Sequence, residues 1–223
     1  MFKKQKILAL VPARKGSKSI KNKNLKLFKK KPLIAWTLIS ALKSKFIDNI
    51  VVSTDCLQIK KISEKYVANV PFVRPKNLAS DKSKTISVVM HLLSKVEEYD
   101  YIILLQPTSP LRSSQDIDNC IRLLINKNKD SLVSLCQNTN HPNLTYAIKK
   151  NKMFKLTKKS MKRRQDAEKF FTINGAIYIS KISWVKKNKK LFDDKSVPFI
   201  MPFERSIDID DEIDWKIGEL LAK

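Results

Sequence analysis

Short apolar runs that favour β-strands alternate along this chain with segments whose apolar residues recur at helical spacing. This alternation predicts an α/β fold in which helices cover both faces of a parallel or mixed sheet. In such folds ligands bind at the carboxyl ends of the strands. The expected strands are Ile7–Val11, Asn49–Ser53, Val70–Val73, Tyr101–Leu105, Asp130–Cys136 and Phe171–Ser180, and the expected helices are 32–45, Leu57–Tyr66, Ser83–Val96, one opened by Ser113, and Asp211–Leu221.

The first expected strand leads directly into a basic loop, in the segment KILALVPARKGSKSIKNKN (Lys6–Asn24). Backbone N–H groups around Gly16 and Ser17 can point at phosphate oxygens, and cations such as Arg14 and Lys23 balance the phosphate charge. The loop is not a Walker A motif, which needs a second glycine and Gly-Lys-Ser/Thr at fixed spacing. The residues alone leave two interpretations open, a polyphosphate site or a solvated edge of the sheet.

Near the other end of the chain, Asp208 and Asp210 alternate with Ile207 and Ile209. In an extended segment this alternation places both carboxylates on one side and both isoleucines on the other. Two carboxylates on one side suit Mg²⁺, which keeps some waters and takes further oxygens from substrate phosphate. The motif is also compatible with a surface turn or a helix N-cap, and the acidic residues within 211–214 could serve the dipole of the last helix.

Two helix starts are expected from polar residues that follow strands. Ser113 and Asp116 lie three residues apart, the spacing of a capping box with a carboxylate in the third position. Asp55 follows the expected strand Asn49–Ser53, and we expect its carboxylate to cap the helix that comes next. Neither histidine, His91 within a helix or His141 before a proline, is expected to be catalytic.

The formal net charge of +24 permits binding to nucleic acid or to another anionic surface. The excess is mainly lysine spread along the chain with few aromatic residues among it, so we favour solvated lysines and expect no specific nucleic-acid partner. No apolar run has membrane-spanning length, so we expect no membrane partner. The basic and apolar start is better explained as the first strand than as a signal peptide, and a cytoplasmic protein is expected. Three cysteines without close spacing fit reduced thiols.

Together these motifs resemble those of the acylneuraminate cytidylyltransferases, also called CMP-N-acetylneuraminic acid synthetases. The resemblance runs in order from about Ile7 to Trp215, through the basic loop and the four blocks VVSTD (51–55), RPKNLASD (74–81), QPTSPLR (106–112) and SIDID (206–210). It implies one cytidylyltransferase domain over residues 1–223, built on a Rossmann-like, nucleotide-binding mixed sheet flanked by helices.

The resemblance also assigns a role to the polar, Lys-rich stretch at about 138–170. In the family this region is a small protruding arm that pairs with a second subunit and reaches into its active site, which implies a homodimer. The residues alone would equally allow a disordered loop.

The family implies CTP as co-substrate and Mg²⁺ as metal, with Asp208 and Asp210 as metal ligands. Arg14 and Lys23 would contact the phosphates, and these four residues would be the catalytic ones. Here Ser19 replaces a glycine usual in the family, so the loop shape is expected to differ slightly. The other residues implied in CTP binding are Gly16, Ser17, Lys18, Asn24, Arg74, Ala79, Ser80, Asp81 and Thr85.

The second substrate of the family is a nine-carbon 2-keto sugar acid, a nonulosonic acid. The resemblance places Gln106, Asn174, Gly175 and Tyr178 on the sugar, and Arg164 on the sugar carboxylate. Many relatives carry an arginine just before the Asn-Gly-Ala block, where this chain has residues 172–173, Thr and Ile. The sequence therefore leaves the particular nonulosonic acid open.

The expected reaction is attack by the anomeric 2-hydroxyl of the sugar on the α-phosphorus of CTP, giving CMP-sugar and pyrophosphate. The residues name no single general base, and a hydroxide on the metal or an aspartate could act. The alternative within the superfamily is a 3-deoxy-octulosonate cytidylyltransferase, but those enzymes typically lack the Lys-Asn end of the first loop and the QPTSP block. A basic nucleic-acid-binding protein is the alternative from another class.

Overall fold

A mixed sheet forms the centre of the computed structural model, which describes residues 2–17, 19–138, 142–155 and 168–222. Six strands lie in the order β10-β6-β9-β5-β1-β4. All pair in parallel except β9, which is antiparallel to both of its neighbours. The strands are β1 (Ile7–Pro12), β4 (Asn49–Ser53), β5 (Tyr101–Leu104), β6 (Ser131–Gln137), β9 (Phe171–Lys181) and β10 (Val197–Met201).

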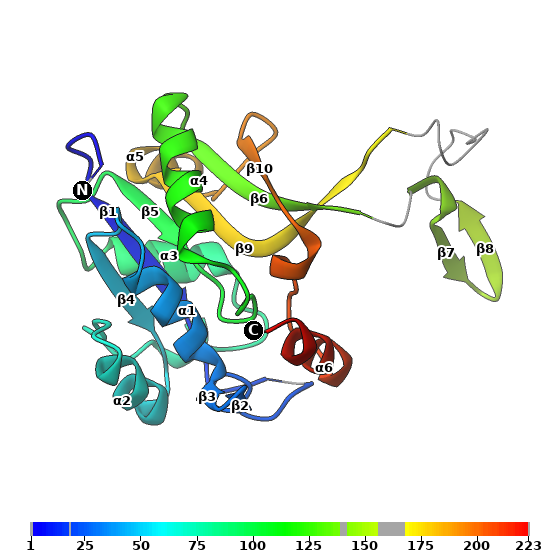
Figure 1. The fold of residues 1–223 in the computed structure, drawn as a ribbon, viewed down its shortest axis with the longest axis horizontal. Coiled ribbons are helices and arrows are strands. Elements are labelled where there is room, and N and C mark those ends of the chain that lie inside the picture. The colour runs from blue at the N-terminus through cyan, green and yellow to red at the C-terminus, as the bar shows by residue number, and fades with distance from the viewer. Residues whose placement is uncertain (1, 18, 139–141, 156–167, 223) are drawn as a thin grey trace.

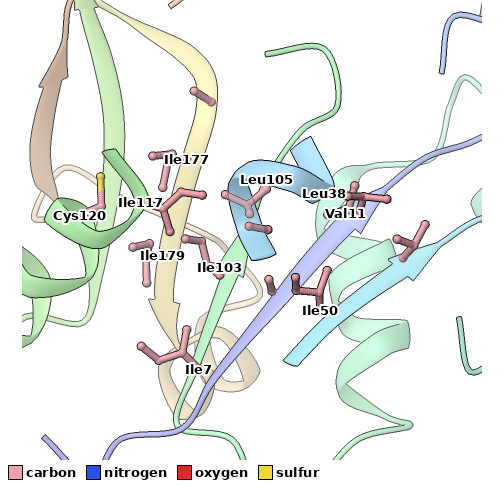
Figure 2. Packing of buried hydrophobic residues seen from close by; sticks show 14 of the residues in the cluster. Ile7, Val11, Leu38, Ile50, Ile103, Leu105, Ile117, Cys120, Ile177 and Ile179 are labelled. Carbon is pink, nitrogen blue, oxygen red and sulfur yellow. The ribbon is translucent and has the colours of Figure 1, made fainter. Parts of the chain in front are cut away.

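Helices cover both faces of this sheet, as the alternation of elements predicts (Figure 1). On one face, α1 (Leu33–Leu42) and α4 (Ser114–Asn126) pack on alternate residues of β1, Ile7, Ala9 and Val11. Figure 2 shows part of this layer. On the other face, α3 (Thr85–Leu93) and α5 (Ile182–Asn188) pack against Leu8 and Leu10. Because both faces are covered, β1 is apolar throughout rather than alternating.

A third apolar cluster lies beside the sheet and fixes the last helix, α6 (Glu212–Leu221). Its Trp215 ring packs edge-on against Phe28 at 5.4 Å between centroids. Phe28 belongs to β2 (Leu27–Phe28), which pairs with β3 (Lys31–Pro32) in a small antiparallel ribbon. The cluster also takes in Ile207 and Ile209. The acidic segment before α6 is therefore anchored by its isoleucines.

The structure corrects one expected strand and adds others. Residues 70–73 form only an isolated bridge, between Thr54 and Val73, because Pro71 has no N–H to donate to a ladder. β10 was not expected from the sequence. The helix α2 (Leu57–Lys65) forms as expected, and short 3₁₀ turns cover 76–78, 142–144 and 203–205.

The stretch 138–170 contains a hairpin of β7 (Tyr146–Lys149) and β8 (Lys152–Lys155), which stands away from the sheet in Figure 1. Its turn is formed by Lys150 and Asn151, both with positive φ, 46° and 58°. Apolar side chains on the hairpin are largely exposed, including Ile148 at 74%. Among the described residues, none of the helices combines the length and the apolar character that a bilayer crossing requires.

Candidate active site

A cleft of about 330 Å³ opens at the carboxyl ends of β1, β4 and β5. This is where the strand order and the basic loop predict a ligand site. Four segments far apart in the sequence meet there: the loop after β1, the loop that precedes α3, the loop after β5, and the segment between β10 and α6. The lining residues are Pro12, Arg14, Gly16, Ser17, Lys23, Asn24, Arg74, Leu78, Ser80, Asp81, Ser83, Thr85, Val88, Gln106, Pro107, Thr108, Asp208 and Asp210.

Hydrogen bonds to neighbouring segments hold the loop after β1 in shape. Asn24 Nδ2 donates to the Arg14 carbonyl oxygen at 2.9 Å. The Lys15 amide donates to Asp55 Oδ1 at 2.8 Å. The expected capping role of Asp55 is wrong, since Cys56 is the N-cap of α2 and that cap has no side-chain hydrogen bond. The Asp55 carboxylate instead holds the backbone of the predicted phosphate loop.

Lys23 joins this loop to the acidic segment. Its Nζ donates to the Ile209 carbonyl oxygen at 2.6 Å and lies 3.4 Å from Asp210 Oδ1. The Ser19 hydroxyl also donates to the Asp210 carbonyl oxygen. The ammonium group of Lys23 is thus held at the cleft, although most of the side chain is buried. An amine fixed beside two carboxylates is suited to meet a phosphate there.

The alternation expected of residues 207–210 is confirmed. Ile207 and Ile209 are buried in the third cluster, while Asp208 and Asp210 line the cleft. The neighbouring acidic residues serve α6: Asp211 is its N-cap in a capping box with Asp214. Helix capping therefore accounts for Asp211 and Asp214 and leaves the carboxylates of Asp208 and Asp210 facing the cleft.

Asp208 is the more deeply buried of these two carboxylates. Burial raises the pKa of Asp208 above its ordinary value, and the negative charge of Asp210 adds to this rise, against a hydrogen bond with Thr108. Within the described residues, Asp208 Oδ1 is buried and has no hydrogen-bond partner. Ionising a carboxylate with such an oxygen costs free energy unless a bound cation supplies the missing partner.

The donor set of the cleft fits a hard divalent cation. No group of three or more His, Cys, Asp or Glu side chains gathers as a metal cage among the described residues. Asp208 and Asp210 are two oxygen donors, and a cation held by only two carboxylates needs waters and substrate phosphate to complete its coordination. Mg²⁺ prefers this arrangement to an all-protein cage. The unpartnered Asp208 Oδ1 is the observation that supports the fit.

On the opposite wall, Arg74 is buried and fixed from several sides. Its Nε donates to Ser53 Oγ at 2.9 Å, and its Nη2 donates to the Ser53 carbonyl oxygen. Burial lowers the Arg74 pKa to about 10, with Asp55 opposing and Arg14 adding to the shift. The guanidinium therefore stays charged at neutral pH. It presents a fixed cation at the wall where the nucleoside is predicted to bind.

The loop after Arg74 carries the other residues predicted for the base. Ser80, Asp81 and Thr85 line the cleft, whereas Ala79 does not. Arg14 Nη1 lies 2.5 Å from Asp81 Oδ1, an ion pair between two partly exposed side chains. This pair links the loop after β1 to the loop before α3 at the cleft, and the other N–H groups of the Arg14 guanidinium can still donate to a phosphate.

Gln106 lies at the floor of the cleft, in the loop after β5. Beneath it Arg112 is fully buried, and Nη1 donates to the Ala176 carbonyl oxygen at 2.8 Å and to that of Gln106 at 3.3 Å. Burial lowers the Arg112 pKa to about 9, against the charge of Asp116. Arg112 therefore ties the Gln106 loop to β9 and does not reach the cleft.

The predicted sugar residues of β9 lie behind Gln106 rather than in the wall of the cleft. Gly175 has φ of +74°, and a side chain there would place Cβ 2.9 Å from Gln106 Oε1 and 3.1 Å from Asp208 Oδ2. Burial and the charge of Asp208 raise the pKa of Tyr178. Asn174 is buried and bonded to protein groups. Two predicted residues, Lys18 and Arg164, lie outside the described residues.

The structure also brings residues to the cleft that sequence reasoning missed. Thr108 lies within the QPTSP block, so its place in that block was a usable signal. Ser83 carries an Oγ that is buried without a partner among the described residues, yet nothing in the sequence separates it from other serines. Val88 reaches the cleft from α3, and an apolar residue within a helix carries no sequence signal for a ligand site.

Comparison with known proteins places this cleft in a family. The cytidylyltransferase family profile matches residues 8–194. The CMP-N,N'-diacetyllegionaminic acid synthase of Legionella pneumophila is 36% identical over 98% of this chain and 97% of its own length. The N-acylneuraminate cytidylyltransferase of Escherichia coli is 34% identical over 96% of this chain, which spans 51% of that longer protein.

The solved structures agree in fold. A CMP:2-keto-3-deoxy-manno-octonic acid synthetase complexed with CTP superposes with a TM-score of 0.75 over 97% of this chain and 98% of that one, at 15% sequence identity. This identity is low enough that the likeness supports the fold alone. Sequence relatives and fold together show that the chain belongs to the cytidylyltransferase family and is a nucleotidyltransferase of its acylneuraminate cytidylyltransferase group.

Proposed function

We propose that this enzyme transfers the cytidylyl group of CTP to a nonulosonic acid and releases pyrophosphate. The observation that carries this proposal is the meeting of the basic loop of Arg14 and Lys23 with the carboxylates of Asp208 and Asp210 across one cleft. The cations suit a triphosphate, and the carboxylates suit the metal that nucleotidyl transfer uses. The names of the relatives from Legionella and Escherichia supply the substrate class.

In this proposal the protein works by position and charge. Arg14 meets the phosphates with guanidinium N–H groups other than the one that faces Asp81, and Lys23 balances the charge that develops on the pyrophosphate. Arg74 and the loop at 80–85 hold the nucleoside, so that the α-phosphorus lies near the acidic segment. Gln106 orients the sugar on the floor of the cleft for in-line attack.

We infer that Asp208 and Asp210 hold Mg²⁺. When bound, the metal neutralises negative charge on the α-phosphate and on the leaving pyrophosphate. The residues of this chain contribute the two carboxylates, and the buried Asp208 Oδ1 gains the partner that it lacks among the described residues. Lys23, which lies 3.4 Å from Asp210 Oδ1, limits how far that carboxylate can turn from the cleft.

The sugar is proposed to be a nonulosonic acid of the legionaminic or sialic type, rather than 3-deoxy-octulosonic acid. The octulosonate enzyme resembles this chain only in fold, at 15% identity, whereas the legionaminic and neuraminic relatives exceed 30% identity. Lysines do lie over the rings of Trp215 and Trp36, but Trp215 is buried and Trp36 is partly buried, so these contacts offer little ring surface for stacking on bases. The product is an activated sugar of the kind that glycosyltransferases use, and the nucleotide co-substrate supports a cytoplasmic site of synthesis.

We also propose that the enzyme acts as a homodimer through the hairpin β7–β8. The hairpin stands away from the sheet with exposed apolar side chains, among them Ile148, Met153 and Phe154 (Figure 1). A projecting surface of this kind is usually covered by a partner. The arrangement supports an arm that packs against a second copy near its active site.

Pyrophosphate release tests the reaction directly. Purified enzyme receives CTP, Mg²⁺ and one of four sugars: N-acetylneuraminic, legionaminic, pseudaminic or 3-deoxy-octulosonic acid. We expect release that needs CTP, Mg²⁺ and a nonulosonic acid, that disappears in Asp208→Ala, and that persists in Ser131→Ala, a buried change far from the cleft. Release with octulosonic acid alone would favour the superfamily alternative. No release together with no CTP binding would overturn the proposal.

A further inference from the structure

Beneath the cleft, three buried polar side chains form a hydrogen-bond network that joins β6, β9 and the segment before Asp208. Asn174 Oδ1 accepts from Ser134 Oγ at 2.6 Å. Asn174 Nδ2 donates to Ser206 Oγ at 2.9 Å. Ser134, Asn174 and Ser206 are 0%, 7% and 8% exposed. Each of the three elements thus contributes one side chain to a network that water does not reach.

The network lies where the backbone leaves regular sheet geometry. The pairing of β6 with β9 shifts register between Val133 and Leu135, so Ser134 sits at the irregularity. Ser134 Oγ accepts from the Ile177 amide at 2.8 Å, and Asn174 Oδ1 accepts from the Ala176 amide at 3.1 Å. These bonds replace part of the ladder that is missing there. They hold the irregular backbone of β9 at Gly175, whose positive φ regular β-strands do not use.

The β9 backbone at Gly175 lies next to the carboxylate of Asp208. A methyl group at Gly175 would lie 3.1 Å from Asp208 Oδ2, so the backbone leaves no free space beside that oxygen. On the other side, the Ser206 hydroxyl donates to the Pro202 carbonyl oxygen at 2.8 Å and accepts from Asn174. The network therefore fixes both the surface that Asp208 faces and the start of the segment that carries it.

We propose that Ser134, Asn174 and Ser206 are positioning residues that set the place of Asp208 in the cleft. The polar atoms of the Asn174 amide are occupied within the protein, its Oδ1 by Ser134 and Ala176 and its Nδ2 by Ser206. Asn174 does not line the cleft. This inference rests on the proposed function, and it gives Asn174 a role different from direct contact with the sugar.

The position of Asp208 decides the rate, whereas contact with the sugar decides affinity. Removing the Ser206 hydroxyl leaves the buried Nδ2 of Asn174 with only the Met201 sulfur, at 3.4 Å. We therefore expect Ser206→Ala and Ser134→Ala each to lower kcat about tenfold, a loss typical of one buried hydrogen bond to a positioned group. The KM values for CTP and for the sugar should remain within about twofold, because no group that meets substrate is removed.

Ser131→Ala is the matched control. Ser131 lies on the same strand β6, is 3% exposed, and shares a 2.6 Å hydrogen bond with Ser196 Oγ at the end remote from the cleft. It should lose stability like the other two variants while keeping wild-type kcat. Ser206→Thr retains the hydroxyl and should recover most of the rate lost in Ser206→Ala.

Amide hydrogen exchange of peptides covering 203–210, in protein without ligands, gives a readout that needs no reaction. We expect faster exchange in Ser206→Ala and Ser134→Ala than in wild type or Ser131→Ala. This result separates the inference from the proposed function, because it holds whichever sugar is used. If Ser134→Ala or Ser206→Ala raises the KM for the sugar and leaves kcat unchanged, the inference is overturned and direct contact of Asn174 with the sugar is favoured instead. Unchanged exchange and unchanged kinetics would also overturn it.

Discussion

At the scale of single residues, Asp208 is a site residue that lowers the stability of the folded state. Its carboxylate is buried, its pKa is raised by burial and by Asp210, and its Oδ1 has no partner within the described residues. A buried charge without a partner destabilises the folded state until a cation or a proton reaches it. Asp210, whose side chain is 79% exposed, carries the same charge at little cost.

We therefore expect Asp208→Asn to raise stability while it removes activity. Without divalent ions at neutral pH the melting temperature should rise by about 2–4 °C, if the cost relieved is about 1 kcal/mol. A raised folded-state pKa means that the cost is present above that pKa and disappears as the pH falls below the ordinary value. The gain should thus shrink on acidification. Thermal melts in EDTA across pH measure it, and Asp210→Asn should lose activity without the gain. A melting temperature lowered at neutral pH would contradict the argument.

Substitution of Arg74 by lysine tests whether CTP binding depends on the geometry of the guanidinium group rather than on its charge. Its fork bonds both the hydroxyl and the carbonyl oxygen of Ser53, and a lysine amine cannot reproduce that planar pattern. We expect Arg74→Lys to raise the KM for CTP about tenfold and to leave the sugar KM within about twofold. Initial-rate kinetics with each substrate varied provide the measurement. Arg122→Lys, on the surface of α4 against Phe46, is the control and should change neither constant. Equal increases in the KM for CTP and in the KM for the sugar would contradict a specific role of Arg74 in CTP binding.

At the scale of elements, local rules predicted most of the sheet and its helices because apolar runs and caps are short-range signals. The capping box of Ser113 and Asp116 is confirmed. β10 was missed because it is an edge strand that contains Pro198. The hairpin was missed because its turn uses Lys150 and Asn151 in place of the Asn-Gly signal.

The residues of the site were likewise predictable only where their signals are short-range. The loop after β1 and the acidic segment were recognisable because their chemistry lies within a few consecutive residues. Ser134 and Ser206 were not, because their role depends on contacts with Asn174 across 40 and 32 residues. Asp55 was assigned to a helix cap for a similar reason, since its partner Lys15 is 40 residues away.

Asp116 gives a prediction at this scale, since it joins α4 to the segment after β10. It caps α4 and also accepts two hydrogen bonds from Arg205, at 2.9 and 3.0 Å. Burial alone would raise the pKa of Asp116, but the hydrogen bonds from Arg205 and Ser113 lower it below the ordinary value. Its stabilising contribution is therefore present above the ordinary pKa and is lost as the pH falls through the lowered one.

Asp116→Asn should accordingly cost about 2 kcal/mol at pH 7, discounted because the Arg205 side chain is 40% exposed. The difference in the free energy of unfolding between the variant and the wild type should become smaller as the pH falls through the acidic range. Urea unfolding at several pH values checks both statements. The double variant with Arg205→Gln should lose little more than Asp116→Asn alone, because the pair is already broken. Fully additive losses would show that the two residues act separately.

At the scale of the whole molecule, the surface combines many lysines with an apolar projection, the hairpin β7–β8. The net charge of +24 is spread over the chain and keeps copies apart, which favours solubility over association. Association then needs a local apolar surface strong enough to overcome that repulsion. The hairpin β7–β8 offers one, with Tyr146, Ile148, Met153 and Phe154 all substantially exposed, as is Leu144 just before it.

Ile148→Asp tests whether this projection holds a dimer together. A carboxylate at a side chain that is 74% exposed should not disturb the folded subunit, but it would have to be buried in an interface. Sedimentation velocity should therefore show dimers of the wild type and monomers of the variant at micromolar concentration. Leu220→Asp is the matched control, because Leu220 is 85% exposed on α6, away from the hairpin in Figure 1. It should leave the dimer intact.

The activity of the same two variants tests what the proposed dimer contributes to catalysis. If the arm contributes to the active site of the partner, Ile148→Asp should lower kcat/KM for the sugar at least about tenfold, while CTP binding by each subunit is retained. Raising the protein concentration should restore part of the loss, because mass action favours reassociation. Full activity of a monomeric variant would show that the hairpin serves assembly and does not contribute to the active site. A monomeric wild type would contradict the proposal that the hairpin forms a dimer.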